Sequence, residues 1–195
     1  LYQKNKEKEA ATKELQILKN KSAELFQDDY SFVGGNNDGK IRIVEFIDYK
    51  CGYCKKNHKI VWSIIKDNSD VKYIVKEFPI LGSQSIMAAQ ALLSVLLYDS
   101  NNTYKSFSDQ LIAYSGSINT KTLKTFAENS GSKILDLETT MKSEKVNLLI
   151  AKNASLAKEL RIEGTPTFII EDQIIRGFLS KNQMQELIEF TRKKL

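Results

Sequence analysis

The chain has 195 residues, 42% of them hydrophobic, and its 29 basic and 24 acidic residues give a net charge of +5. This length and apolar content predict one globular domain, or a core with one large insertion. Acidic and basic residues are mixed throughout, with no arginine-rich run, which argues against a nucleic-acid-binding module. The longest apolar stretch, residues 86–98, is interrupted by Gln90 and Ser94 and is too short to cross a membrane, so we expect a buried helix there.

The beginning of the chain predicts an exposed helix. Residues 1–27 are rich in Lys, Glu, Ala, Gln and Leu and contain no Gly or Pro. Spacing like that of coiled-coil a and d positions is shared by Leu15, Leu18, Ser22 and Leu25. An arm for self-association and a helix lying on its own domain both fit this pattern. The absence of an initial methionine fits a mature exported protein or a trimmed chain.

A run rich in Gly and Asn, residues 34–39, marks a boundary. We therefore expect residues 1–33 to form an extension and residues 34–195 to form the main domain. The β-branched and aromatic residues 41–49 predict a buried strand, which leads directly into a helix at 51–66 and a second strand at 71–78. This order is a βαβ unit.

Residues 84–160 show only helical patterns and predict an inserted helical subdomain. We expect helices at 84–99, 102–114, 120–129 and, in one or two pieces, 133–160, with N-caps at Asn101, Asn119 and Ser132.

The last part of the chain predicts a hairpin and a final helix. Strands at 167–170 and 173–176 flank the polar turn Glu171-Asp172. Ser180, with Gln183 three residues later, forms a capping box for the final helix.

The two cysteines of the chain, Cys51 and Cys54, lie at the predicted junction between strand and helix. Unsatisfied backbone N–H groups and the helix dipole stabilise a thiolate at this place. We expect Cys51 to be the nucleophile of disulfide exchange, and Cys54, one turn deeper, to resolve the mixed disulfide. Lys55 and Lys56 add positive potential nearby.

Three other uses of a cysteine pair fit this sequence less well. Zinc needs two further ligands, and His58 is the only histidine of the chain; a surface histidine is the better interpretation. A haem attachment site needs His directly after Cys54, where Lys55 stands. A purely structural disulfide of this spacing closes too short a loop to stabilise much. We therefore expect no metal and no cofactor.

Two further residues are candidates for the site. Pro166, after Gly164-Thr165, starts a strand, and a cis bond there would free the Thr165 backbone to pair with an extended substrate. Glu45 lies in the middle of a strand, either exposed on one face or buried under the cysteines with a raised pKa, where it would exchange the proton of Cys54. The residues alone leave these alternatives open.

Together these features resemble the DsbA/DsbC/ScsC group of periplasmic thioredoxin-fold proteins. The resemblance rests on Val44-Glu45-Phe46, Cys51-Gly52-Tyr53-Cys54, Glu77-Phe78-Pro79, the helical insertion and Gly164-Thr165-Pro166-Thr167-Phe168. It implies an α/β thioredoxin fold with an inserted helical subdomain at about 84–160 and an N-terminal helical extension. It also implies that the catalytic residues are Cys51, Cys54 and Glu45, and that the cis-proline loop is formed by Thr165 and Pro166. We add Gly52 and Tyr53 to the substrate contacts.

The variable positions of the motif indicate the isomerase branch. Oxidases of the group usually carry Pro-His between the cysteines and Val before the cis-proline, whereas this chain has Gly52-Tyr53 and Thr165. We expect a periplasmic or otherwise extracytoplasmic disulfide isomerase, and the resemblance of the extension to the trimer stalk of ScsC-like proteins implies a homotrimer formed through residues 1–27. Its expected partners are misfolded or cysteine-containing exported proteins and a membrane redox partner, without nucleic acid. The alternatives are a monomeric dithiol oxidase and, in another class, a Cu(I)-binding or holdase protein.

Overall fold

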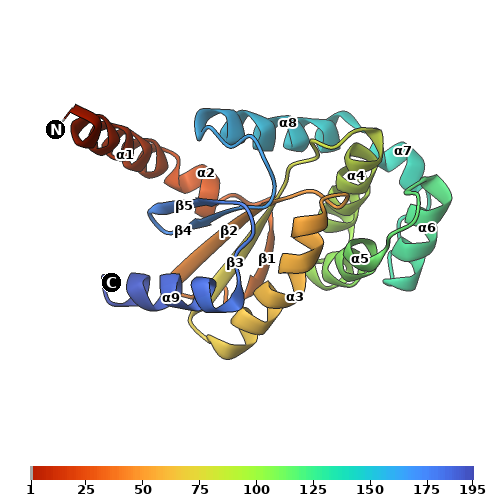
Figure 1. The fold of residues 1–195 in the computed structure, drawn as a ribbon. Helices are drawn as coiled ribbons and strands as arrows, with labels where there is room; N and C mark the ends of the chain where they lie inside the picture. The colour runs from red at the N-terminus through yellow and green to blue at the C-terminus, as the bar shows by residue number, and fades with distance from the viewer. Residues whose placement is uncertain (1) are drawn as a thin grey trace.

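A five-stranded sheet forms the centre of the computed structural model, which describes residues 2–195 (Figure 1). The strands are β1 (Phe32–Gly35), β2 (Ile41–Ile47), β3 (Val71–Glu77), β4 (Thr167–Ile170) and β5 (Gln173–Arg176). Their spatial order is β1-β3-β2-β4-β5. β2 and β3 pair in parallel, and the other neighbours are antiparallel. A parallel pair needs a crossover, which α3 (Gly52–Asp67) provides.

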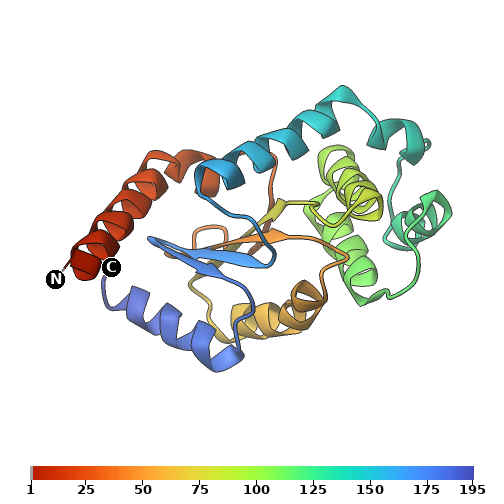
Figure 2. The same ribbon diagram turned by 45° about the horizontal axis from the view of Figure 1, so that its top comes forward.

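Helices cover both faces of this sheet (Figures 1 and 2). α3 and α9 (Lys181–Arg192) pack on one face, and α2 (Ser22–Phe26) and α8 (Glu144–Glu159) pack on the other. Alternate side chains of β2 therefore enter two separate cores. Ile43 and Ile47 lie in the core on the α3 side, whereas Val44 and Phe46 lie in the core beside α8. Glu45 alternates with Val44 and Phe46, so it points toward the α3 side.

The predicted helical insertion begins with helices at one end of the sheet, on the right in Figure 1, and ends with α8, which runs back over the sheet at the top. Its helices are α4 (Ser83–Tyr98), α5 (Asn101–Ala113), α6 (Thr120–Asn129), α7 (Leu137–Met141) and α8. The cap at Asn119 is confirmed, because its side chain accepts the Thr122 N–H.

Two other predicted caps of the insertion were wrong. Ser100, not Asn101, caps α5, and Asp136 and Ser143 cap the two helices that follow α6. Ser132 instead donates its hydroxyl to Asp99 at 2.6 Å.

The N-terminal extension is a long helix followed by a docked short one. α1 (Tyr2–Asn20) is exposed over residues 5–13, but Leu18 is buried, as are Leu25 and Phe26 of α2. The buried residues join the core on the α8 side of the sheet. The second part of the extension therefore lies on its own domain, whereas the first part projects from it (Figure 1).

Strand β1 was not predicted, and it begins inside the range 1–33 that was assigned to the extension. Gly34 and Gly35 suggested a turn, yet both pair with β3. A Cβ atom on Gly34 would lie 2.9 Å from the Trp62 ring, and Gly35 has a φ of +71°. These glycines permit close packing of a strand edge. The sheet therefore starts at Phe32.

The final helix begins as predicted. Ser180 accepts the N–H of Gln183, and the Gln183 side chain accepts the N–H of Ser180, which completes the capping box of α9. Across residues 2–195, the described helices lack the combined length and hydropathy that a membrane crossing requires.

Candidate active site

Cys51 lies at the point where β2 ends and α3 begins. It is the N-cap residue of α3, with extended backbone angles, and its sulfur accepts the Cys54 N–H at 3.2 Å. Cys51 retains 6% of its surface exposed, whereas Cys54 is fully buried, and both are free thiols. The two cysteines therefore differ in access: Cys51 keeps a small exposed surface and Cys54 keeps none.

The environment pushes the pKa values of the two thiols apart. The hydrogen bond with the Cys54 side chain lowers the pKa of Cys51 from 9.0 to about 6, and backbone N–H groups of Cys54 and Tyr53 act in the same direction against burial. Burial, the bond to Cys51 and the charge of Glu45 all raise the pKa of Cys54. At neutral pH the outer sulfur is a thiolate and the inner one is a thiol.

The loop before β4 faces the outer sulfur. Thr165 and Pro166 are joined by a cis peptide bond, and the Cys51 Sγ lies 3.3 Å from the Thr165 carbonyl oxygen. The Pro166 carbonyl accepts the Gly177 N–H at 2.9 Å, which ties the loop to the chain after β5. Residues 114 positions apart in the sequence thus meet at one sulfur.

Glu45 is buried, with 1% of its surface exposed, so the exposed alternative does not apply. Its Oε2 accepts the Tyr73 hydroxyl at 2.5 Å, and its Oε1 has no partner among the described residues. Burial raises the pKa of Glu45 from 4.5 to about 8; the Tyr73 bond opposes this rise and the charge of Cys51 adds to it. Glu45 therefore titrates near pH 8, and its charge also acts on Cys54.

Tyr73 and Asp48 also belong to the site, although neither was predicted from the sequence. The Asp48 carboxylate accepts the backbone N–H groups of Lys50, Ile80 and Leu81 at 2.8 to 3.0 Å, and the hydroxyl of Ser85 at 2.8 Å. It joins the turn before Cys51 to the loop after β3. The only local sign of the bridging role of Asp48 is its position between a strand and a turn. No local sign points to Tyr73, because its contact with Glu45 depends on the register of the sheet.

The other sequence candidates are exposed or bound elsewhere. Gly52 has open space where a Cβ would lie, and Tyr53 is 58% exposed. His58 contacts Asp109 through Nε2 at 2.8 Å and packs against the edge of Trp62. In residues 2–195, no group of three or more His, Cys, Asp and Glu side chains is arranged to hold a metal ion.

A thiolate at a helix N-terminus, backed by a buried thiol and facing a cis-proline loop, defines a thiol–disulfide oxidoreductase. A family model described as Thioredoxin matches residues 27–190, and the chain belongs to this family.

Known proteins agree with this assignment. Disulfide bond formation protein D of Bacillus subtilis (strain 168) is 26% identical over 164 residues, which are 80% of this chain and 74% of that protein. A thioredoxin-like oxidoreductase of Silicibacter pomeroyi DSS-3 is 32% identical, with a TM-score of 0.81, covering 88% of this chain and 97% of that one. A linker-deletion mutant of Proteus mirabilis ScsC shares the fold with a TM-score of 0.90 at 24% identity, covering 98% of this chain and 88% of that one.

These findings confirm the predicted class and fold. The protein is a thiol–disulfide oxidoreductase of the DsbA/ScsC type with a Cys-x-x-Cys pair. Its fold is an α/β thioredoxin fold with a helical insertion and an N-terminal helix.

Proposed function

We propose that this protein is a disulfide isomerase that acts on misfolded exported proteins through the Cys51 thiolate. The observation that carries the proposal is a stabilised outer thiolate next to a dipeptide, Gly52-Tyr53, that supplies no charge. A couple of this kind is less oxidising than one with a cationic histidine beside the nucleophile, so its dithiol form persists and reshuffles disulfides.

Each step of the reaction balances at the sulfurs. Cys51 attacks one sulfur of a substrate disulfide, which forms a mixed disulfide and releases a substrate thiolate. That thiolate attacks another disulfide of the same substrate. A substrate thiolate then attacks the mixed disulfide and frees Cys51, with no net oxidation.

Cys54 and Glu45 resolve the mixed disulfide when the bound substrate does not rearrange. The Cys54 thiol transfers its proton to the Glu45 carboxylate and attacks the Cys51 sulfur, and the substrate leaves as a thiolate. The protein is then oxidised at Cys51 and Cys54. A membrane-bound dithiol reductant has to reduce this disulfide before the next cycle.

The substrate contacts are proposed at Thr165, Pro166, Gly52 and Tyr53. The Thr165 carbonyl lies beside the Cys51 sulfur, where an extended segment pairs with the loop backbone as an added strand would. Gly52 leaves the approach to the sulfur open, and the exposed Tyr53 ring offers an apolar surface.

An oligomer would hold several such sites around one substrate, and we propose a trimer formed through residues 1–27. Support comes from the exposed surface of α1 over residues 5–13, ahead of the docked part of the extension. The Glu14 carboxylate accepts from Arg176 at 3.0 Å and fixes where the projection begins.

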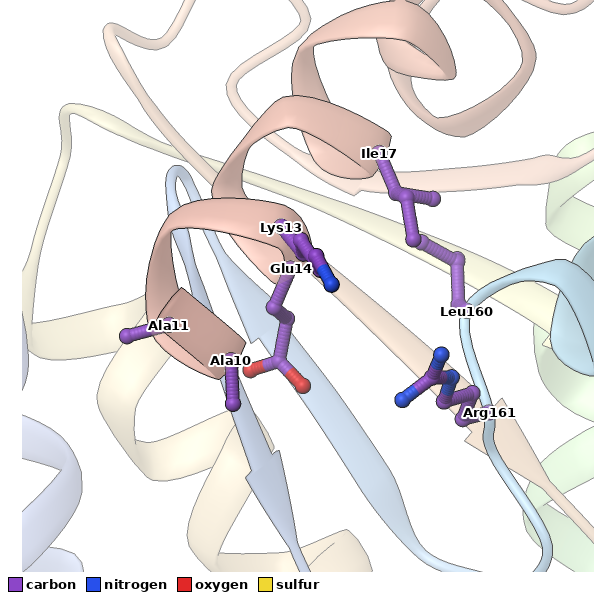
Figure 3. A pocket seen from close by; sticks show the side chains of 7 residues that line it. All are labelled: Ala10, Ala11, Lys13, Glu14, Ile17, Leu160 and Arg161. Carbon is purple, nitrogen blue, oxygen red and sulfur yellow. The ribbon is translucent and has the colours of Figure 1, made fainter. Parts of the chain in front are cut away.

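A hollow of about 230 Å³ lies beside this point, between α1 and the end of α8 (Figure 3). Ile17 and Leu160 point toward each other across it. The division into an arm, a thioredoxin domain and an insertion at about 84–160 is part of the same proposal.

We place this activity in an extracytoplasmic compartment, because disulfides persist there.

The test is reactivation of scrambled, oxidised ribonuclease in a glutathione buffer. Removing residues 1–33 would delete the buried Leu18, Leu25 and Phe26 and part of β1, so the matched variant begins at Lys13 instead. We expect the full chain to restore activity and to sediment as a trimer, and the shortened chain to lose both properties. Equal reactivation by both chains would contradict the role of the arm.

A dithiol oxidase is the second candidate, because the same depressed pKa of Cys51 also suits an oxidant. Failure of both chains to reactivate scrambled ribonuclease, together with rapid oxidation of reduced ribonuclease, would favour the oxidase and overturn the isomerase.

A further inference from the structure

The segment of the chain that carries the two cysteines is rich in lysine and contains no acidic residue. Between Asp48 and Asp67 the sequence contains no Asp or Glu, but it contains Lys50, Lys55, Lys56, Lys59 and Lys66. We call the three lysines nearest to Cys51 in the sequence the lysine rim: Lys50, Lys55 and Lys56. Lys56 is exposed and the other two are half-buried.

The ammonium groups of the lysine rim are held near the site without a carboxylate partner. No ion pair of Lys50, Lys55 or Lys56 is found within residues 2–195. The Lys55 Nζ donates to the Tyr114 carbonyl, which fixes its position. Burial, together with the charge of Lys50, lowers the pKa of Lys55, so these two ammonium groups act on each other. The positive charge of the lysine rim is therefore not neutralised by an ion pair within the described residues and can attract a negatively charged ligand.

An aromatic pair adjoins the lysine rim. The rings of Tyr53 and Phe178 lie 6.2 Å apart and are 58% and 41% exposed. The Lys56 Nζ is 5.2 Å from the centre of the Tyr53 ring. Phe178 follows Gly177, whose N–H holds the Pro166 carbonyl, so the pair lies beside the loop that faces Cys51.

The acidic residues near the site do not cancel this charge. Asp48 and Glu45 are buried, and the four hydrogen bonds to Asp48 use its carboxylate inside the fold. Asp109 pairs with His58 and Lys105. Glu163 is exposed before the Thr165 loop, and it forms no ion pair with the three lysines within residues 2–195.

We propose that the lysine rim selects substrate segments that carry carboxylates beside the reacting cysteine, with an apolar or aromatic residue for the Tyr53 and Phe178 pair. This inference rests on the proposed exchange at Cys51 and names its substrate class. A negatively charged segment is attracted over a distance of about 10 Å at moderate salt, which spans the surface around the sulfur. Such attraction raises association rates by a factor of about 10 or more.

Three peptides of equal length test the proposal. Each contains one cysteine, activated as a mixed disulfide with the uncharged 2-thiopyridine, and two flanking Glu, Gln or Lys residues. The Cys51 thiolate attacks the peptide sulfur, the peptide becomes bound through a disulfide, and 2-thiopyridine leaves with the electron pair and is protonated. We expect the Glu peptide to react about 10-fold faster than the Lys peptide at low salt, and the ratio to fall toward one as salt is added.

Lysine-to-glutamine variants distinguish the effect of the lysine rim from the effect of the protein's other positive charges. The double variant Lys50→Gln and Lys56→Gln should reduce the Glu-to-Lys rate ratio severalfold, and adding Lys55→Gln should reduce it further. Lys193→Gln removes the same charge from an exposed lysine next to Arg192, which pairs with Asp70 beyond the other end of α3, and it should leave the ratio unchanged. Because the ratio compares two peptides on one protein, a change in the reactivity of Cys51 itself cancels.

The outcomes distinguish the inference from the proposed function. Equal rates for the three peptides at low salt, or a ratio that the double variant leaves intact, would overturn the selectivity while leaving exchange at Cys51 in place. If even the Gln peptide reacts no faster with this protein than with its Cys51→Ser variant, the exchange activity fails, and the selectivity with it.

Discussion

Two buried carboxylic acids on neighbouring strands have nearly the same surroundings. Glu45 of β2 and Glu77 of β3 are 1% and 2% exposed. Each accepts a tyrosine hydroxyl, from Tyr73 and Tyr104 respectively, and each has one carboxylate oxygen without a partner among the described residues. Burial raises the pKa of both from 4.5 to about 8.

The two acids differ in what lies next to them. The charge of Glu45 acts on Cys54, and the charge of Cys51 acts on Glu45. The network of Glu77 leads elsewhere: Tyr104 lies 3.4 Å from the Tyr49 hydroxyl, which contacts Ser108 at 2.8 Å. A raised pKa therefore shows that an acid is buried, but the groups next to the acid determine whether it can take part in proton transfer.

The largest expected difference between the two acids is in the resolution of a mixed disulfide. Glu45→Gln should slow the attack of Cys54 about 100-fold at neutral pH, because the proton acceptor is lost. Glu77→Gln has the same change of charge and shape and should stay within about twofold of the wild type, because Glu77 bonds Tyr104, and Glu45 is the acid whose charge acts on Cys54. Single-turnover release of a peptide from its disulfide with Cys51 measures this step. Equal losses in both variants would show that the two acids act as one unit.

The sequence was sufficient for those parts of the fold and site that depend on local pattern. Strands β2 to β5, the helices α3 and α9 and the helical insertion follow from residue periodicity and caps. The position of Cys51 at a strand-to-helix junction followed from the same patterns. The proximity of Cys51 to Thr165 was expected from a resemblance, since no local signal connects residues 114 positions apart.

The parts that were missed depend on contacts between distant segments. The Gly34-Gly35 pair looks like a turn until Trp62 is packed against it. Glu45 could be exposed or buried until helices are known to cover both faces of the sheet. Tyr73 becomes the partner of Glu45 only when β2 and β3 pair in parallel with Ile43 opposite Tyr73. Register of this kind is a property of the folded sheet.

A smaller effect, common to both acids, is expected in the pH dependence of stability. The folded protein holds a proton on Glu45 and on Glu77 up to about pH 8, whereas the unfolded chain releases it near pH 4.5. Their contribution to stability is therefore complete below about pH 4.5 and is lost as the pH rises toward 8. Each acid should account for on the order of 2 kcal/mol, because one pKa unit corresponds to about 1.4 kcal/mol and local relaxation offsets part of the burial cost.

Urea unfolding at about pH 5 and about pH 8 measures this loss. A background with Cys51→Ser and Cys54→Ser is needed, because the lowered pKa of Cys51 contributes in the opposite direction. In that background, Glu45→Gln and Glu77→Gln should each flatten the decrease by a similar amount. A flattening by only one of them would show that the other acid is ionised in the folded protein.

The smallest effects are expected from the tyrosine partners, and they isolate the proton-transfer role most cleanly. Tyr73→Phe and Tyr104→Phe each remove one hydrogen bond to a buried acid and should each cost about 1 kcal/mol of stability. The Tyr73 hydroxyl holds the pKa of Glu45 down, so its loss should move the midpoint of the pH–rate profile for Cys54 attack upward by up to about one unit. Tyr104→Phe loses an equivalent bond and should leave that midpoint in place, because Glu77 does not take the proton. An equal shift in both variants would mean that the midpoint reports general loosening of the core around the sheet, and the assignment of Glu45 as the proton acceptor would then have to be withdrawn.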